Sequence, residues 1–212
     1  MVKTILFQGD SITDCGRVRE NARSVSQAVG PGYPALVAAR VKNNDWSKKY
    51  NFINRGVSGD RVVDLYARWK RDALNLRPDV ISILIGVNDT WHEQNYGNGV
   101  EPERYDKFYR MLMDWTKEAL PDTRMILLEP FVLKFGFVTD AWVSEIDIRR
   151  QMVKKIAEDY GAVFVPLQEI ISEKAIEAAD PEIVLADGVH PTLFGHQIIA
   201  DQYLEYAGDL LK

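Results

Sequence analysis

The sequence predicts an α/β protein with three layers, in which a five-stranded parallel sheet is covered by helices on both faces. Three observations support this prediction. Short apolar runs alternate with longer helical patterns along the whole chain of 212 residues. The short runs are mostly unbroken, as in strands that are buried on both faces of a sheet. No linker, internal repeat or low-complexity tract interrupts the pattern, so we expect a single domain over residues 1–212.

Five short runs rich in Ile, Val, Leu or Phe predict strands at residues 4–8, 51–54, 80–85, 125–128 and 162–165. The longer patterns predict helices at residues 33–42, 62–76, 102–120, 140–160 and 192–211. Pro102 stands at the start of one helix, where a missing N–H costs nothing, and Gly161 closes the next. The segment 129–138 carries three Phe residues and has two interpretations. It is a loop folded onto its own core, or it covers a pocket or a subunit contact.

Composition and charge exclude several classes of partner. A net charge of −5 provides no basic surface for nucleic acid or for an anionic membrane. No run of about 18 apolar residues occurs that would span a membrane. Cys15 is the only cysteine, so neither an internal disulfide nor a CxxC pair can form. The first apolar stretch is too short for a signal peptide, and we therefore expect a cytoplasmic protein.

Polar clusters follow the first three predicted strands, and a fourth precedes the last predicted helix. They read GDS at residues 9–11, NRGVSGD at 54–60, GVND at 86–89 and DGVHP at 187–191. In open parallel sheets, ligands bind outside the carboxyl ends of the strands, at the point where the strand order reverses. One fold of this class can therefore bring all four clusters together.

Ser11 has two interpretations. It forms a capping box with Asp14, which stands three residues later, and starts a helical turn. Alternatively it is a nucleophile, which requires a base, an orienting acid and oxyanion donors.

His190 is the best candidate for the base among the three histidines. Pro191 keeps it off the following helix. Asp187 stands three residues earlier and is placed to fix the tautomer of the imidazole. The alternative is a surface loop in which both side chains are merely solvated. His196 falls inside the predicted last helix, where a packing or surface role is common.

Gly59 and Asn88 are the candidate oxyanion donors. Gly59 offers a backbone N–H in a glycine-rich turn, without a side chain in the way. Asn88 offers a neutral amide N–H₂. Either residue alone is more often a turn former. With the N–H of Ser11, they would make three donors to a developing oxyanion.

In this order, the four clusters resemble the four blocks of the SGNH hydrolases, also called GDSL esterases and lipases. The resemblance spans residues 9–190. It implies a flavodoxin-like fold, a catalytic triad of Ser11, His190 and Asp187, and an oxyanion hole of Ser11, Gly59 and Asn88. Ile12 replaces the last letter of GDSL, which is a swap between apolar residues. The stretches GDSITDCGR, ARW at 67–69 and IGVNDTW at 85–91 are similar to the intracellular acetylxylan esterases of the family.

This resemblance implies an esterase that removes acetyl groups from xylo-oligosaccharides by two-step acyl transfer, without a metal or organic cofactor. The expected partner is a small acetylated saccharide, and a homo-oligomer is expected. Asp10 and Trp91 are candidate substrate contacts. Asp10 and Asp89 also fit a role as turn stabilisers, and Trp91 and Trp142 fit the core equally well. The sequence shows no apolar lid suited to a long acyl chain, which favours acetyl esters.

Several other interpretations stay open. A broad-specificity short-chain esterase or a lysophospholipase-like hydrolase would use the same residues. Cys15 as nucleophile stands four residues beyond Ser11. A phosphatase that uses Asp10 lacks its expected second acid, because Ile12 occupies that position. No nucleotide-binding GxxxxGK[ST] or GxGxxG follows a strand. A carbohydrate-binding domain that lost catalysis is the non-enzymatic alternative, although every catalytic position is filled.

Overall fold

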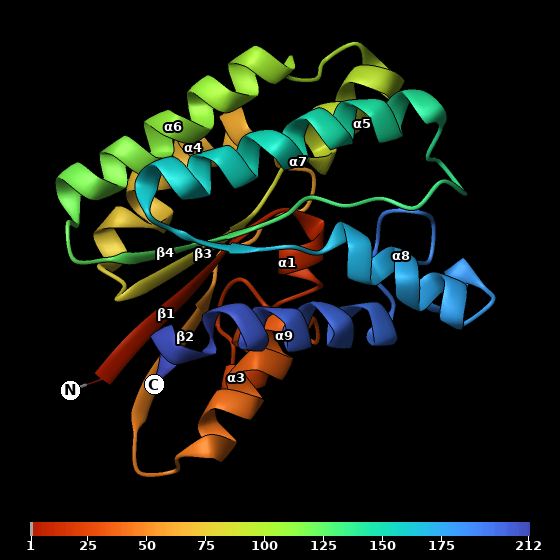
Figure 1. Cartoon of the computed structure of the whole chain (residues 1–212). Helices are drawn as coiled ribbons and strands as arrows, with labels where there is room; N and C mark the ends of the chain where they lie inside the picture. Colours follow the sequence, from red (N-terminus) through yellow and green to blue (C-terminus); the bar gives the residue numbers. More distant parts are fainter. Residues whose placement is uncertain (1) are drawn as a thin grey trace.

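The computed structural model describes residues 2–212, and Figure 1 shows their arrangement. Five parallel strands form one sheet in the order β2-β1-β3-β4-β5. The strands are β1 (Val2–Gly9), β2 (Lys49–Asn54), β3 (Val80–Leu84), β4 (Arg124–Leu128) and β5 (Val163–Val165). The main helices are α3 (Tyr33–Asn44), α4 (Val62–Asp72), α5 (Val87–Tyr96), α6 (Pro102–Ala119), α7 (Asp140–Tyr160), α8 (Gln168–Glu177) and α9 (Leu193–Ala207).

Two apolar cores lie on opposite faces of the sheet, which confirms the predicted three layers (Figure 1). Side chains alternate across a strand, so Ile5 and Phe7 of β1 enter one core while Leu6 enters the other. The first core lies under α3 and α9, and the second lies under α4, α6 and α7. Among residues 2–212, no helix is both long and apolar enough to cross a membrane.

Two predicted helices end earlier than their patterns indicate. Helix α4 ends at Asp72, because the backbone of Ala73 leaves the helical region (φ −132°, ψ −67°) and a short 3-10 turn, η1 (Leu74–Leu76), follows. Helix α9 ends at Ala207, and a second 3-10 turn, η3 (Gly208–Leu211), buries Leu211. In both 3-10 turns, apolar side chains continue the helical pattern of the sequence, although the backbone is wound more tightly than in an α-helix.

The segment 129–138 folds onto the core for most of its length. Phe131, Val132 and Val138 are buried, and the last two join Trp142 in a third apolar cluster. This is the first of the two interpretations that the sequence left open. Among the large apolar side chains of the segment, Phe137 is the exception, because it remains 58% exposed.

Candidate active site

The candidate site lies at the carboxyl ends of β1 and β3. The strand order reverses between these two strands, since β2 lies on one side of β1 and β3 to β5 lie on the other. This is the switch point at which ligands of such folds bind. The structure brings the first and last polar clusters together here: the Oγ of Ser11 lies 3.0 Å from the Nε2 of His190, although 179 positions separate them in the sequence.

A sharp turn presents Ser11. Gly9 ends β1 with a φ of +154°, and a Cβ there would overlap the carbonyl oxygen of Leu84 on β3. The short helix α1 (Ser11–Asp14) then begins at Ser11 itself. Its N-cap is Asp10, whose Oδ1 accepts a hydrogen bond from the N–H of Ile12 at 3.0 Å. The capping interpretation of Ser11 is therefore wrong, and its hydroxyl is free for another role.

Asp187 orients His190 through a tight loop. The Oδ1 of Asp187 accepts hydrogen bonds from the backbone N–H groups of Val189, at 3.0 Å, and His190, at 2.8 Å. Its Oδ2 lies 2.7 Å from the Nδ1 of His190. Partial burial alone would raise the pKa of Asp187, but these hydrogen bonds outweigh it and hold the pKa below its usual value.

An ionised Asp187 fixes the tautomer of His190. Because a carboxylate only accepts hydrogen bonds, Nδ1 carries the proton and donates it to Asp187. The Nε2 atom then presents a lone pair to Ser11, whose Oγ–H is the donor. The arrangement can remove a proton from the serine hydroxyl, and the adjacent carboxylate stabilises the imidazolium that results.

Gly59 and Asn88 follow β2 and β3 at the same end of the sheet. Gly59 has a φ of +88°, and the space where a Cβ would stand is open. Asn88 is in the first turn of α5, and its Nδ2 donates a hydrogen bond to the carbonyl oxygen of Asp60 at 3.2 Å. The amide has two N–H donors, and among residues 2–212 the second has no protein acceptor. The Asn88 amide therefore has a donor left for a ligand.

Asp10 and Asp89 are buried, and the carboxyl group of each accepts hydrogen bonds from the backbone. Asp10 caps α1, and Asp89 accepts hydrogen bonds from the N–H of Val62 at the start of α4. Burial raises the pKa of each to about 7. Asp10 is only 1% exposed, so its burial argues against the predicted substrate contact and agrees with a turn stabiliser.

Aromatic side chains lie beside the imidazole of His190. The ring centroid of Trp91 is 5.7 Å from that of His190, and Trp91 also packs against Phe137 and Trp142 at 5.3 and 5.2 Å. Trp142 is buried and belongs to the core. Trp91 is half-buried and Phe137 is exposed. The sequence did not single out Phe137, whose only signal was its place in the apolar segment.

Cys15 is not activated as a nucleophile. Its Sγ lies 3.3 Å from the Nε2 of His196. The N–H of Tyr33 donates to the Nδ1 of the same imidazole, so neutral His196 carries its proton on Nε2, facing the sulfur, and has no lone pair there. Burial raises the pKa of Cys15 and lowers that of His196 to about 4, so both stay uncharged. His196 is a buried packing residue, as its place in a helix predicts.

Sequence reasoning missed Arg68 and Asp60, which form a buried ion pair at 2.6 Å, next to the loop that carries Gly59. The ARW motif at 67–69 was the only signal for Arg68.

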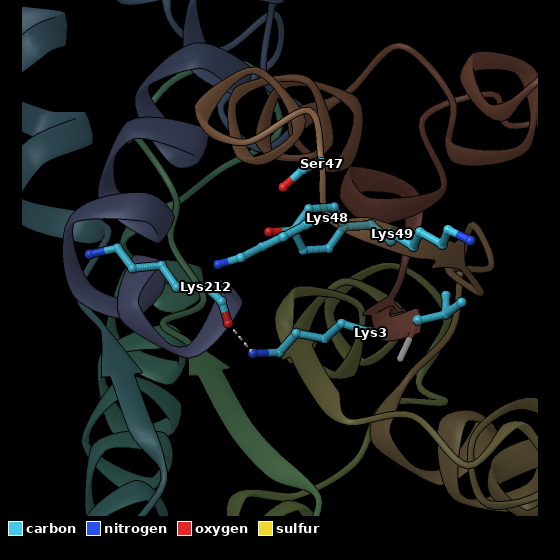
Figure 2. A pocket seen from close by; sticks show the side chains of 7 residues that line it. Lys3, Ser47, Lys48, Lys49 and Lys212 are labelled. Atoms are coloured by element: carbon cyan, nitrogen blue, oxygen red, sulfur yellow. Dashed lines mark hydrogen bonds between the residues drawn. The ribbon is translucent and has the colours of Figure 1, made fainter.

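A cavity of about 560 Å³ lies at the opposite end of the sheet, beside Lys3 of β1 and Lys49 of β2 (Figure 2). None of the predicted site residues lines it.

Known proteins are similar to this chain over nearly its whole length. The model of the GDSL-like lipase/acylhydrolase family matches residues 7–198. The chain is 34% identical to an acetylxylan esterase of Geobacillus stearothermophilus, over 96% of this chain and 93% of the relative. It is 28% identical to a multidomain esterase of Ruminococcus flavefaciens, of which it spans 29%.

Solved structures show the same likeness. A protein of Parabacteroides merdae described as a GDSL-like lipase superposes with a TM-score of 0.92 at 39% identity, over 99% of this chain and 96% of the other. Axe2, an acetylxylan esterase from Geobacillus stearothermophilus, superposes with a TM-score of 0.86 at 33% identity, over 96% and 93%. Two variants of Axe2, changed at a serine and at an aspartate, are described as catalytic mutants. The chain belongs to the GDSL-like lipase/acylhydrolase family and is a carboxylic ester hydrolase.

Proposed function

We propose that the chain hydrolyses acetyl esters of xylo-oligosaccharides, with Ser11 as nucleophile, His190 as general base and Asp187 as the acid that orients it. The hydrogen-bond chain from Ser11 through His190 to Asp187, with distances of 3.0 and 2.7 Å, is the observation that carries the proposal. The catalytic serine and aspartate variants of Axe2 support it.

The reaction proceeds in two steps. His190 takes the hydroxyl proton as the Oγ of Ser11 attacks the ester carbonyl, and it returns that proton to the leaving sugar oxygen. Water then attacks the acetyl-serine with the same base, which releases acetate. The N–H of Ser11, the N–H of Gly59 and the free N–H of Asn88 stabilise the tetrahedral oxyanion in both steps.

Substitution of Ser11 tests the nucleophile. We expect Ser11→Ala to lose nearly all hydrolysis of an aryl acetate while it stays folded, because the alanine has no oxygen to attack. Ser144→Ala is the matched control, since Ser144 is exposed and its hydroxyl donates only to the carbonyl of Asp140 in its own helix. Fluorophosphonate should label the wild type and not Ser11→Ala. Equal turnover by wild type and Ser11→Ala would refute the assignment.

Trp91 and the exposed ring of Phe137 would contact the sugar. The ring of Trp91 lies next to His190, from which the proton passes to the leaving sugar oxygen, and Phe137 packs against Trp91. We expect Trp91→Ala to raise the KM for acetylated xylo-oligosaccharides by about tenfold, consistent with the loss of one stacking contact, while hydrolysis of a small aryl acetate changes little. Trp46→Ala is the control, because Trp46 is 71% exposed and lies in the loop before β2. Equal effects on both substrates would assign Trp91 to packing alone.

The acyl chain can be tested separately. The segment 129–138 packs onto the core, and we therefore propose that acetate esters are hydrolysed faster than octanoate esters of the same alcohol. Faster turnover of octanoate would favour a lipase-like enzyme. A single domain over residues 1–212, a homo-oligomer, a cytoplasmic location and the lack of nucleic-acid or membrane partners stay predictions.

A further inference from the structure

Arg68 makes an unusual set of buried contacts behind the candidate site. It projects from α4, and its side chain is 10% exposed. Its Nε donates to the Oδ2 of Asp60 at 2.6 Å, its Nη1 donates to the Oε1 of Gln8 at 2.9 Å, and its Nη2 donates to the carbonyl oxygen of Gly9 at 3.3 Å. One guanidinium thus joins the end of β1 to the loop that follows β2.

Two of these contacts, to Gly9 and to Asp60, lead to groups proposed to bind the oxyanion. Gly9 lies two residues before Ser11, at the sharp turn that presents its N–H. Asp60 directly follows Gly59, and its own N–H donates to the carbonyl of Val57 at 3.1 Å, which closes the turn around Gly59. The carbonyl of Asp60 accepts the hydrogen bond of Asn88.

Stability alone does not account for this ion pair. Burial raises the pKa of Asp60 even though Arg68 acts in the opposite direction, so the desolvation of the carboxylate is not fully offset by its partner. A buried pair with such a cost is retained in some proteins because it fixes one geometry. The planar guanidinium suits that role, since its donors point in fixed directions whereas a lysine supplies a single charged nitrogen.

We propose that Arg68 is a positioning residue, which sets the relative places of the three oxyanion donors by tying the Gly9 carbonyl to the Asp60 side chain. The proposal rests on the proposed function, because it assumes that Ser11, Gly59 and Asn88 stabilise the oxyanion. Arg68 has no hydrogen bond to Ser11, His190 or Asp187, so it acts on transition-state stabilisation and leaves proton transfer unchanged.

A double-mutant cycle separates positioning from a purely structural role. Arg68→Gln should lower kcat for an aryl acetate by tenfold or more and change KM by less than about threefold, because the lost stabilisation appears in the transition state. In an Asn88→Ala background, the same substitution should cost at least threefold less than it does in the wild type, since one of the three donors that Arg68 positions is already absent. Arg71→Gln is the control on the same helix, with a side chain that is 78% exposed, and should leave kcat unchanged.

The other outcomes are equally informative. Additive losses, in which Arg68→Gln costs as much with Ala at position 88 as with Asn, would overturn the positioning role. If Arg68→Gln does not fold, Arg68→Lys takes its place in the cycle, and failure of both to fold would assign Arg68 to stability and refute the proposal. If Asn88→Ala alone retains full activity, the oxyanion assignment fails, and that result is distinct from a failure at Arg68.

Discussion

The hydroxyl of Ser11 is available because its neighbour Asp10 supplies the helix cap. The two side chains have different roles in the turn from β1 to α1. The buried carboxyl group of Asp10 accepts a backbone hydrogen bond, and the hydroxyl of Ser11 faces His190. The same division recurs at the third cluster. Asp89 holds the start of α4, and Asn88, one position earlier, keeps an N–H donor free.

Single residues also show how far sequence reasoning reaches. Ser11, Asp187 and His190 could be predicted to meet, since the base had to be one of only three histidines and Asp187 stands three residues before one of them. The ion pair of Arg68 and Asp60 could not be predicted from the sequence. Both are common surface residues, eight positions apart, and no local pattern shows that their loop and helix close over the end of β1.

The proposed oxyanion role of Asn88 can be tested by substitution. Asn88→Ala should lower kcat for an aryl acetate about a hundredfold, equivalent to roughly 3 kcal/mol of transition-state stabilisation. The expected loss lies in kcat because the donor acts on charge that develops only during the reaction. Steady-state kinetics with a circular dichroism control will measure it. A loss below about threefold in a folded variant would remove Asn88 from the oxyanion hole.

The sequence patterns predict the strands more accurately than the helices. The strands were predicted closely because a buried parallel strand is an apolar run with few alternatives. Helices α5 and α8 were missed. Each has ten residues, and α5 begins directly at the polar GVND cluster, where Gly86 turns the chain with a φ of +137°. The polar residues of the GVND cluster also form the first turn of α5, so the sequence pattern there resembles a loop.

The segment 129–138 acquires a role at the scale of elements: it braces the loop that carries Asp187. The N–H of Leu133 donates to the carbonyl of Gly188 at 2.9 Å, and the N–H of Phe137 donates to that of Asp187 at 3.3 Å. Gly188 has a φ of +91°, and a Cβ there would overlap the carbonyl of Phe135 and lie 2.7 Å from that of Leu133. The two segments approach so closely because position 188 has no side chain.

Gly188→Ala should therefore push the segments apart and misplace Asp187. We expect kcat to fall by at least tenfold and thermal stability to fall as well, since an alanine at this φ costs roughly 1–2 kcal/mol before the overlap is counted. Gly161→Ala is the matched control, because Gly161 also has a positive φ, +64°, but open space around it. It should lose stability and keep its activity. Unchanged activity in Gly188→Ala would show that the brace does not position Asp187.

For the molecule as a whole, the layered architecture could be predicted from the sequence, but the burial of titratable carboxyl groups could not. The strand order β2-β1-β3-β4-β5 is that of the flavodoxin-like fold, which the family resemblance implied. Burial of Asp10 and Asp89 could not be read from the sequence, because a carboxylate in a loop cluster is usually solvated. Both lie in the interior beneath the site, and each disfavours ionisation of the other.

These buried carboxyl groups should make the stability of the protein fall as pH rises. Burial, partly offset by the Val62 N–H and by Arg149, leaves the pKa of Asp89 in the folded protein at about 7, above the ordinary value of 3.8. The folded state therefore binds a proton more tightly than the unfolded state. Stability from this proton is fully present below about pH 4 and is lost as pH rises through about 7, a loss on the order of 2–4 kcal/mol.

Asp89→Asn isolates this contribution, because the amide is neutral at every pH and its oxygen can still accept the hydrogen bond from Val62. Urea denaturation at about pH 4 and about pH 8 should show that the free energy of unfolding of the variant, relative to wild type, increases with pH. Asp10 titrates in both proteins and largely cancels in the difference, although its own pKa should fall once the neighbouring charge is removed. A variant destabilised equally at both pH values would show that Asp89 is ionised throughout and that its burial is matched by partners such as Arg149.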